Sequence, residues 1–126
     1  MPWASIEGGV ELGRMTPSIS NGRPAALVFL RPNIEQMGEV VARVARHDAL
    51  MRATVIYAIC LHEIGHALGL ADTADRLDIM WGGGKDSLTR YQRYRLRLQN
   101  RNSISTVSWL SEGDVARIKE RYREPR

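Results

Sequence analysis

The cysteine content constrains this chain most: Cys60 is the only cysteine, so no intramolecular disulfide can form. A small domain without such cross-links relies on its apolar core, or on a bound metal that contributes folding energy directly. The 126 residues are enough for one compact domain and too few for two, so we expect a single domain over residues 1–126. Apolar residues make up 44%, as in ordinary globular proteins.

The sequence contains no targeting or membrane signal that we can identify. No apolar run approaches the roughly 20 residues that a spanning helix needs, so we expect no membrane span. Residues 1–7 lack a basic region followed by an apolar stretch and do not resemble a signal peptide, although a processed chain would look the same. The sequence does not indicate the cellular compartment or the oligomeric state.

The net charge of +4 is unevenly distributed. Residues 85–101 carry one acidic residue, Asp86, and six basic ones: Lys85, Arg90, Arg93, Arg95, Arg97 and Arg101. Such a patch could attract nucleic acid, an anionic surface or an acidic peptide. We favour the simpler interpretation, a solvated face, because long basic side chains cover apolar surface while their heads stay in water. We therefore do not expect a nucleic-acid partner.

The first third of the chain predicts a hairpin. Val10–Met15 is typical of a short strand, and the apolar run Ala25–Leu30, between Pro24 and Pro32, predicts a buried strand. A turn signal at residues 21–22 (Asn-Gly) lies between the two runs.

Two helices are predicted next. Asn33 can cap a helix over residues 34–47, whose apolar residues share one face: Ile34, Met37, Val40, Val41 and Val44. A second helix runs from about Ala49 to Leu68 and is stopped by Gly69.

The remainder of the chain is less regular. Residues 70–89 have little periodicity and predict a loop, whereas residues 90–110 fit either a strand at 95–98 or a helix with Tyr91, Tyr94 and Leu98 on one face. Ser111 can cap a last helix, and this helix has three residues that we expect to face inward: Val115, Ile118 and Tyr122.

Two histidines on the second helix indicate a metal site. His62 and His66 are four residues apart and so lie one turn apart on the same helical face. Zinc takes nitrogen and oxygen ligands tetrahedrally, and catalytic sites have three protein ligands and one open position for water. Glu63 can reach that water and take its proton. The pattern His-Glu-x-x-His is accordingly a metalloprotease signature.

A third ligand is expected just after this helix. Gly69 lets the backbone leave the helix sharply, by adopting a positive φ, so that the chain can fold back. Asp72 then occupies the position of a third ligand, and a carboxylate binds zinc well. Asp75 and Asp78 lie in the same stretch and remain alternatives. In a zincin of another clan the third ligand would be a distant acid such as Glu112.

Residues 62–72 read His-Glu-x-x-His-x-x-Gly-x-x-Asp, which resembles the metzincin signature with Asp72 in place of the third histidine, as in the small snapalysin-type members. Residues 78–81, Asp-Ile-Met-Trp, resemble the Met-turn of matrixins, in which the methionine (here Met80) forms an apolar floor beneath the metal. Residues 110–122 are similar to the last helix of matrixin catalytic domains.

This resemblance covers residues 54–82 closely and residues 110–122 more loosely. It implies an α+β fold, a reduced metzincin-like zincin in which a small sheet packs on a backing helix and an active-site helix, followed by a Met-turn and a C-terminal helix. It also suggests an extracellular protein. Only about sixty residues precede the active-site helix, so the upper half is reduced or rearranged. Trp81 and two glycines stand where matrixins usually carry Pro and Tyr near the specificity pocket.

Several other residues have two interpretations. Tyr91 or Tyr94 could stabilise an oxyanion but more simply packs in the core, and Trp81 could line a pocket or belong to the core. Cys60 reads as a small buried apolar residue. His47 is the only histidine outside the motif, so we expect no second, structural zinc site.

The sequence therefore predicts a zinc-dependent endopeptidase that acts on a peptide or protein substrate. Zn²⁺ is held by His62, His66 and Asp72, and Glu63 activates the metal-bound water. The alternative is a zinc-stabilised, non-catalytic binding module that uses the basic segment 85–101. Retention of Glu63 argues against this alternative, because a structural metal needs no general base.

Overall fold

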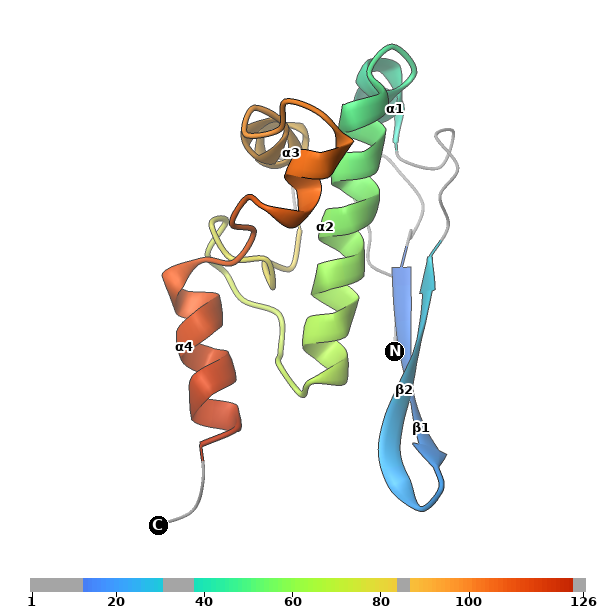
Figure 1. The fold of residues 1–126 in the computed structure, drawn as a ribbon, viewed down its shortest axis with the longest axis vertical. Helices are drawn as coiled ribbons and strands as arrows, with labels where there is room; N and C mark the ends of the chain where they lie inside the picture. Colours follow the sequence, from blue (N-terminus) through green and yellow to red (C-terminus); the bar gives the residue numbers. More distant parts are fainter. Residues whose placement is uncertain (1–12, 31–37, 84–86, 124–126) are drawn as a thin grey trace.

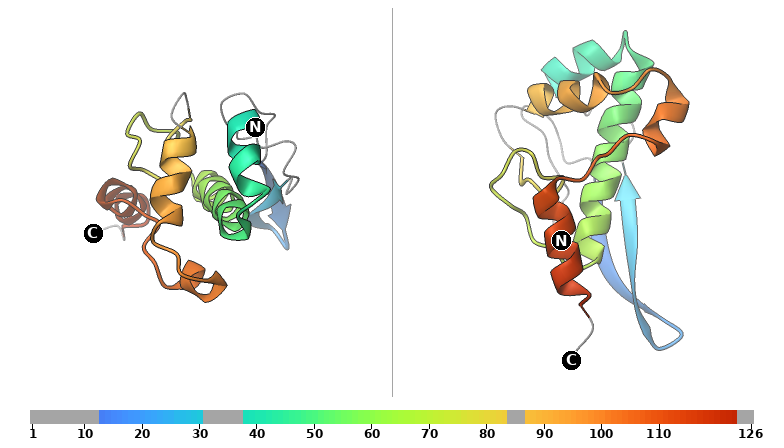
Figure 2. Two further views of the ribbon diagram at one scale, coloured as in Figure 1. Left: turned by 90° about the horizontal axis from the view of Figure 1, so that it is seen from above. Right: turned by 60° about the vertical axis from the view of Figure 1, so that its left-hand side comes forward.

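The computed structural model describes residues 13–30, 38–83 and 87–123. These residues form a small α+β fold with a two-stranded antiparallel sheet and four α-helices, which confirms the predicted class (Figure 1). The elements follow in the order β1 (Gly13–Ser20), β2 (Arg23–Leu30), α1 (Glu39–Ala45), α2 (Ala49–Ala67), α3 (Ser87–Arg95), the 3-10 helix η2 (Arg101–Ser105) and α4 (Glu112–Arg121). Helix α2 runs through the middle, with the hairpin on one side and α3 and α4 on the other (Figures 1 and 2).

The ends of α2 agree with the prediction. The Asp48 side chain caps the helix by accepting from the backbone N–H groups of Leu50 and Met51, at 3.0 and 3.2 Å. Such a cap contributes about 1 kcal/mol. At the other end the backbone turns at Gly69, whose φ is +93°, a conformation that glycine adopts without a steric penalty.

The predicted hairpin is present, and it is longer than expected. Asn21 and Gly22 connect the strands with φ values of +52° and +74°, the positive values that a two-residue type I′ turn requires. β1 extends to Ser20, well beyond Met15, while residues 10–12 of the predicted strand lie outside the described residues.

The prediction that Ala25–Leu30 is a buried strand is wrong. Leu27 and Phe29 are 53% and 46% exposed, whereas Val28 and Leu30 are half-buried. The reason is that a two-stranded sheet has two faces and α2 covers only one of them, near the start of β1 where Met15 is buried. The tip of the hairpin extends past the end of α2 (Figure 1).

The first predicted helix is described only in part. α1 covers Glu39–Ala45, and its predicted start at Asn33–Ile34 lies outside the described residues. Val41, Ala42 and Ala45 face the core, but Val40 is 51% exposed, so its assignment to the apolar face was wrong.

The ambiguous segment is helical rather than extended. α3 begins at Ser87, within the predicted loop, and ends at Arg95, so residues 95–98 form no strand. Tyr91, Tyr94 and Leu98 are buried together, as the helical interpretation requires.

The last helix has the predicted cap and a different buried face. The Ser111 side chain accepts from the Asp114 N–H, and the Asp114 carboxylate accepts from the Ser111 N–H, both at 2.9 Å. Val115 and Tyr122 are 37% and 58% exposed, so they do not face inward as predicted. Asp114 is fully buried instead, because the first turn of α4 packs against residues 78–80.

The core lies around α2 and draws on the helices and on the loop that follows α2. Its buried members include Met51, Val55, Ile59, Ile79, Met80, Tyr91, Tyr94 and Trp109. No helix within residues 13–30, 38–83 and 87–123 is long and apolar enough to cross a membrane.

Candidate metal centre

Three side-chain atoms converge at the end of α2. The Nε2 atoms of His62 and His66 are 3.1 Å apart, and the Asp72 Oδ1 lies 3.1 Å from the first and 3.0 Å from the second. The two imidazoles are nearly perpendicular, at 87°. The structure thus brings together the three residues that the sequence predicts as ligands.

The second nitrogen of each imidazole points at a backbone carbonyl. His62 Nδ1 lies 2.8 Å from the Ile79 oxygen, and His66 Nδ1 lies 2.8 Å from the Leu70 oxygen. A carbonyl can only accept, so each Nδ1 carries the proton and donates it, which leaves the Nε2 lone pair free in the neutral ring. Burial lowers the pKa of His62 and keeps this ring neutral. This is the tautomer and orientation that metal-binding histidines have.

The turn after α2 places Asp72. The Gly69 and Leu70 N–H groups donate to the carbonyls of His66 and Gly65, both at 2.9 Å, which closes the helix end and reverses the chain. Just beyond Asp72, Thr73 pairs with the strand-like segment at Trp81. Asp72 is thus held between a helix end and a backbone bridge, although its side chain is 57% exposed.

The alternative ligands lie elsewhere. The Asp75 carboxylate accepts from the Leu77 N–H at 2.9 Å in the same exposed loop. Asp78 is buried and is engaged by Thr73 Oγ1 and the Arg117 guanidinium, both at 2.7 Å. Glu112 is exposed in the first turn of α4, and among the described residues it contacts neither histidine.

Glu63 lies beside the histidines as a buried carboxylate. It is 1% exposed, and one of its oxygens lies within 4.8 Å of a ligand nitrogen of each histidine. Its Oε2 atom has no hydrogen-bond partner within the part of the chain that is described. Burial raises the pKa of Glu63, and the negative charge of Asp72 acts in the same direction, so this carboxylate is a stronger base than an exposed one.

Met80 lies directly against α2 at Gly65, the residue before His66. It is fully buried, and a Cβ atom added at Gly65 would overlap the Met80 sulfur. Gly65, in the middle of the motif, is therefore required by the methionine's position. A glycine inside a helix is unusual, because alanine would be more favourable there, and the sequence shows this. The contact with Met80 that explains the glycine is visible only in the structure.

Asp114 holds the turn that contains Met80, a role that sequence reasoning missed. Its carboxylate accepts from the N–H groups of Ile79 at 2.7 Å and Met80 at 3.4 Å, and from Arg117 at 3.2 Å. The Ile79 carbonyl in turn orients His62. A buried carboxylate on α4 thus positions the carbonyl on which the first imidazole depends.

The basic segment 85–101 does not form one solvated face. Arg90 is 6% exposed and donates to the carbonyls of Asp78 and Ile79, at 3.2 and 2.9 Å. Arg95 forms an ion pair with Asp48 at 2.8 Å. The interpretation as a solvated face is wrong for these two arginines, because the protein uses their charges in its tertiary contacts; Lys85 and Asp86 lie outside the described residues.

The remaining residues are placed as follows. Tyr91 and Tyr94 are in the core, and the Tyr94 ring packs on Trp109 with a centroid distance of 4.9 Å. Trp81 is half-buried, with the Arg90 guanidinium 5.6 Å from its ring centre. Cys60 is half-buried on α2, and burial raises the pKa of its thiol.

The donor set fits zinc. Bonds of about 2.0–2.1 Å at tetrahedral angles separate ligand atoms by about 3.3 Å, close to the observed separations. Two imidazole nitrogens and one carboxylate oxygen occupy one face of such a tetrahedron and leave the fourth position for water.

Comparisons with known protein families, with curated proteins and with solved structures found no match to this chain.

Proposed function

We propose that this protein is a zinc-dependent endopeptidase. In this proposal His62, His66 and Asp72 hold the metal, and Glu63 is the general base. The observation that carries the proposal is the convergence of three acceptor atoms within 3.1 Å of one another. In the Nδ1-protonated tautomer that the two carbonyl contacts favour, none of these three atoms carries a proton, and a cation is what such a set accommodates.

The orphaned oxygen of Glu63 supports a catalytic rather than a structural metal. A buried carboxylate oxygen without a hydrogen-bond partner is costly. A catalytic role in taking up a proton explains why such an oxygen is kept beside the three ligands. A zinc ion bound here supplies Lewis acidity, which polarises a substrate carbonyl and lowers the pKa of a water molecule. Glu63 takes the proton from the attacking water and later delivers it to the leaving amine.

The anionic ligand Asp72 affects how much of the hydrolysis rate depends on Glu63. Asp72 is anionic, so it reduces the electrophilicity of the bound cation relative to a third neutral imidazole. More of the rate then depends on proton transfer to Glu63, whose pKa burial already raises toward that of a useful base.

We also propose that the centre is arranged as in metzincins. The support comes from three features of the structure: the turn at Gly69, Met80 packed against Gly65 of the active-site helix, and a C-terminal helix whose Asp114 contacts the Met80 turn. The upper half of the described fold is reduced, since it has a two-stranded hairpin and one short helix.

Metal analysis combined with peptide cleavage tests the function. We expect one zinc per chain and cleavage of a diverse peptide library that a chelator abolishes and added zinc restores. The non-catalytic binding module predicts stoichiometric zinc without turnover, and association with an anionic ligand that weakens with salt. Zinc without chelator-sensitive cleavage would therefore favour the binding module.

The third ligand can be tested separately. Asp72→Ala is expected to weaken zinc binding by more than about 100-fold, because replacing even an outer-shell partner typically costs 10- to 100-fold. Asp75→Ala is the matched control, since it removes an exposed carboxylate from the same loop. Competition with a chromophoric chelator measures both affinities. If Asp75→Ala or Glu112→Ala loses zinc while Asp72→Ala retains it, the assignment of the third ligand is wrong.

A further inference from the structure

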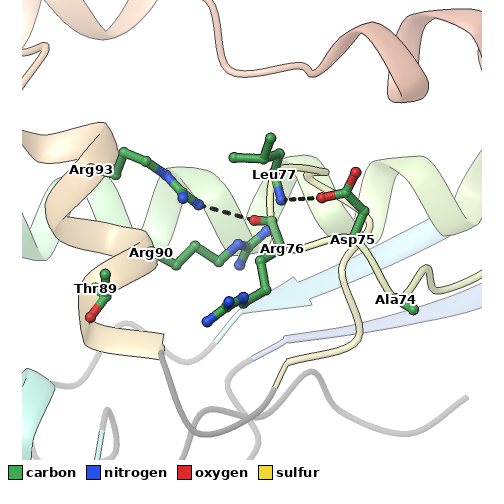
Figure 3. A pocket seen from close by; sticks show the side chains of 7 residues that line it. All are labelled: Ala74, Asp75, Arg76, Leu77, Thr89, Arg90 and Arg93. Carbon is green, nitrogen blue, oxygen red and sulfur yellow. Dashed lines mark hydrogen bonds between the residues drawn. The ribbon is translucent and has the colours of Figure 1, made fainter.

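A second concave site lies between the loop 74–77 and helix α3. It is a cavity of about 500 Å³, and the α3 side chains that line it are Thr89, Arg90 and Arg93 (Figure 3). Arg90 and Arg93 reach from α3 toward the loop in Figure 3, and Arg76 adds a third arginine on the loop side. This volume suits a small organic molecule.

The charges that line this cavity are unbalanced. Three arginines face one carboxylate, that of Asp75, which already accepts a hydrogen bond from the Leu77 N–H. Like charges gathered on one concave surface repel one another and raise the local concentration of counter-ions. The cavity wall therefore favours an anion.

Arg90 strengthens this argument because its charge is buried. Arg90 donates to two neutral carbonyls, those of Asp78 and Ile79. Within the described residues it makes no ion pair with a carboxylate, and its Nε has no hydrogen-bond partner. The rings of Trp81, Tyr91 and Tyr94 surround its guanidinium at 5.6–5.9 Å. The field of a buried cation is less screened by water than that of a surface arginine, so Arg90 adds to the attraction for an anion.

Arg93 supplies the accessible donor. It is half-buried, and its Nη2 donates to the Arg76 carbonyl at 3.0 Å, which holds the guanidinium at the cavity (Figure 3). An arginine held in this way loses less conformational entropy when it binds a planar carboxylate or a phosphate. The Thr89 hydroxyl on the preceding turn is a further donor.

We propose that this cavity binds a small ligand through an oxyanion group, a phosphate or a carboxylate, held by Arg93 and Thr89 against the buried charge of Arg90. The cavity shares no lining residue with the cation site: it lies between the loop 74–77 and α3, whereas the converging ligands are His62, His66 and Asp72. The proposal does not depend on peptide hydrolysis.

The test is a titration of the full ¹⁵N-labelled chain, with and without added zinc, followed by NMR. The probes are inorganic phosphate and glutarate at constant ionic strength, with chloride as the reference. We expect saturable shifts at residues 74–77 and 89–93, including the Arg93 Nε–H signal. Whichever probe binds more tightly distinguishes a phosphate ligand from a carboxylate one.

Arg93→Gln should weaken this binding about tenfold or more, the loss expected for a charge-assisted hydrogen bond. Thr89→Ala should weaken it less, and both residues are accessible enough for the variants to fold. Arg101→Gln removes the same charge from an exposed position outside the cavity and should leave the affinity unchanged. The absence of saturable shifts with both probes, or equal weakening in Arg93→Gln and Arg101→Gln, overturns the proposal.

Discussion

Replacing Glu63 with glutamine is expected to lower the kcat of peptide hydrolysis by about 10²- to 10⁴-fold, the usual contribution of a general base. The amide has the size of the carboxylate but cannot take a proton from water. Zinc binding should be unchanged, because Glu63 is not one of the three converging ligands. The measurement is kcat on the best library peptide, together with the zinc content of the purified variant.

The same variant separates catalysis from folding. Burial raises the pKa of Glu63, so its ionised form destabilises the native state at neutral pH, and a neutral amide should leave the free energy of unfolding unchanged or increase it. Glu112→Gln is the control, since it neutralises an exposed carboxylate away from the centre. Full activity of Glu63→Gln would refute the mechanism, and loss of zinc would show that Glu63 is a ligand instead of a base.

The parts of the fold that could be predicted depend on local chemistry. Gly69 at the end of α2 and Ser111 before α4 act on backbone groups within a few residues, so the sequence alone indicates them. Asn-Gly at 21–22 likewise specifies its own turn.

Burial could not be predicted in the same way. The apolar run in β2 reads as a buried strand, but burial depends on what covers each face of the sheet. Among the described elements only α2 covers it, on one face. Arg90 shows the reverse error: a basic residue in a basic segment reads as exposed, yet carbonyls 11 and 12 residues away in the chain hold it inside. Both outcomes follow from tertiary contacts that local periodicity does not encode.

In the candidate site, too, the features set by local sequence could be predicted and those set by tertiary contacts could not. The helical repeat places His62 and His66 together, and their spacing alone indicates this. The sequence favours Asp72 over Asp75 and Asp78, but it does not exclude Asp78. Asp78 is held in a buried network by Ser111 and Arg117, which lie more than thirty residues further along the chain. The carbonyl partners of the imidazoles are backbone atoms, so no residue type marks them.

The second large effect is expected at Asp114. Asp114→Ala should lower the free energy of unfolding by about 1–3 kcal/mol, the range for leaving a buried hydrogen-bond donor without its acceptor. It leaves the buried N–H of Ile79 without its acceptor and removes one of the two carboxylates that pair with Arg117, which keeps Asp78 as a partner. It should also weaken zinc binding by about 10- to 100-fold, as for other outer-shell residues, because Ile79 carries the carbonyl that orients His62. Chemical denaturation and zinc competition measure the two effects.

Glu112→Ala is the matched control for this prediction. Glu112 is an exposed acid in the same first turn of α4, so its loss should cost only the interaction with the helix dipole, about 0.3–1 kcal/mol, and should not change zinc affinity. Asp114→Asn keeps one acceptor oxygen and should fall between Asp114→Ala and the unmodified chain in both measurements. Asp114→Ala could destabilise the fold and still bind zinc normally. In that case the Met80 turn supports the core without positioning His62, and the predicted coupling between α4 and the metal centre is wrong.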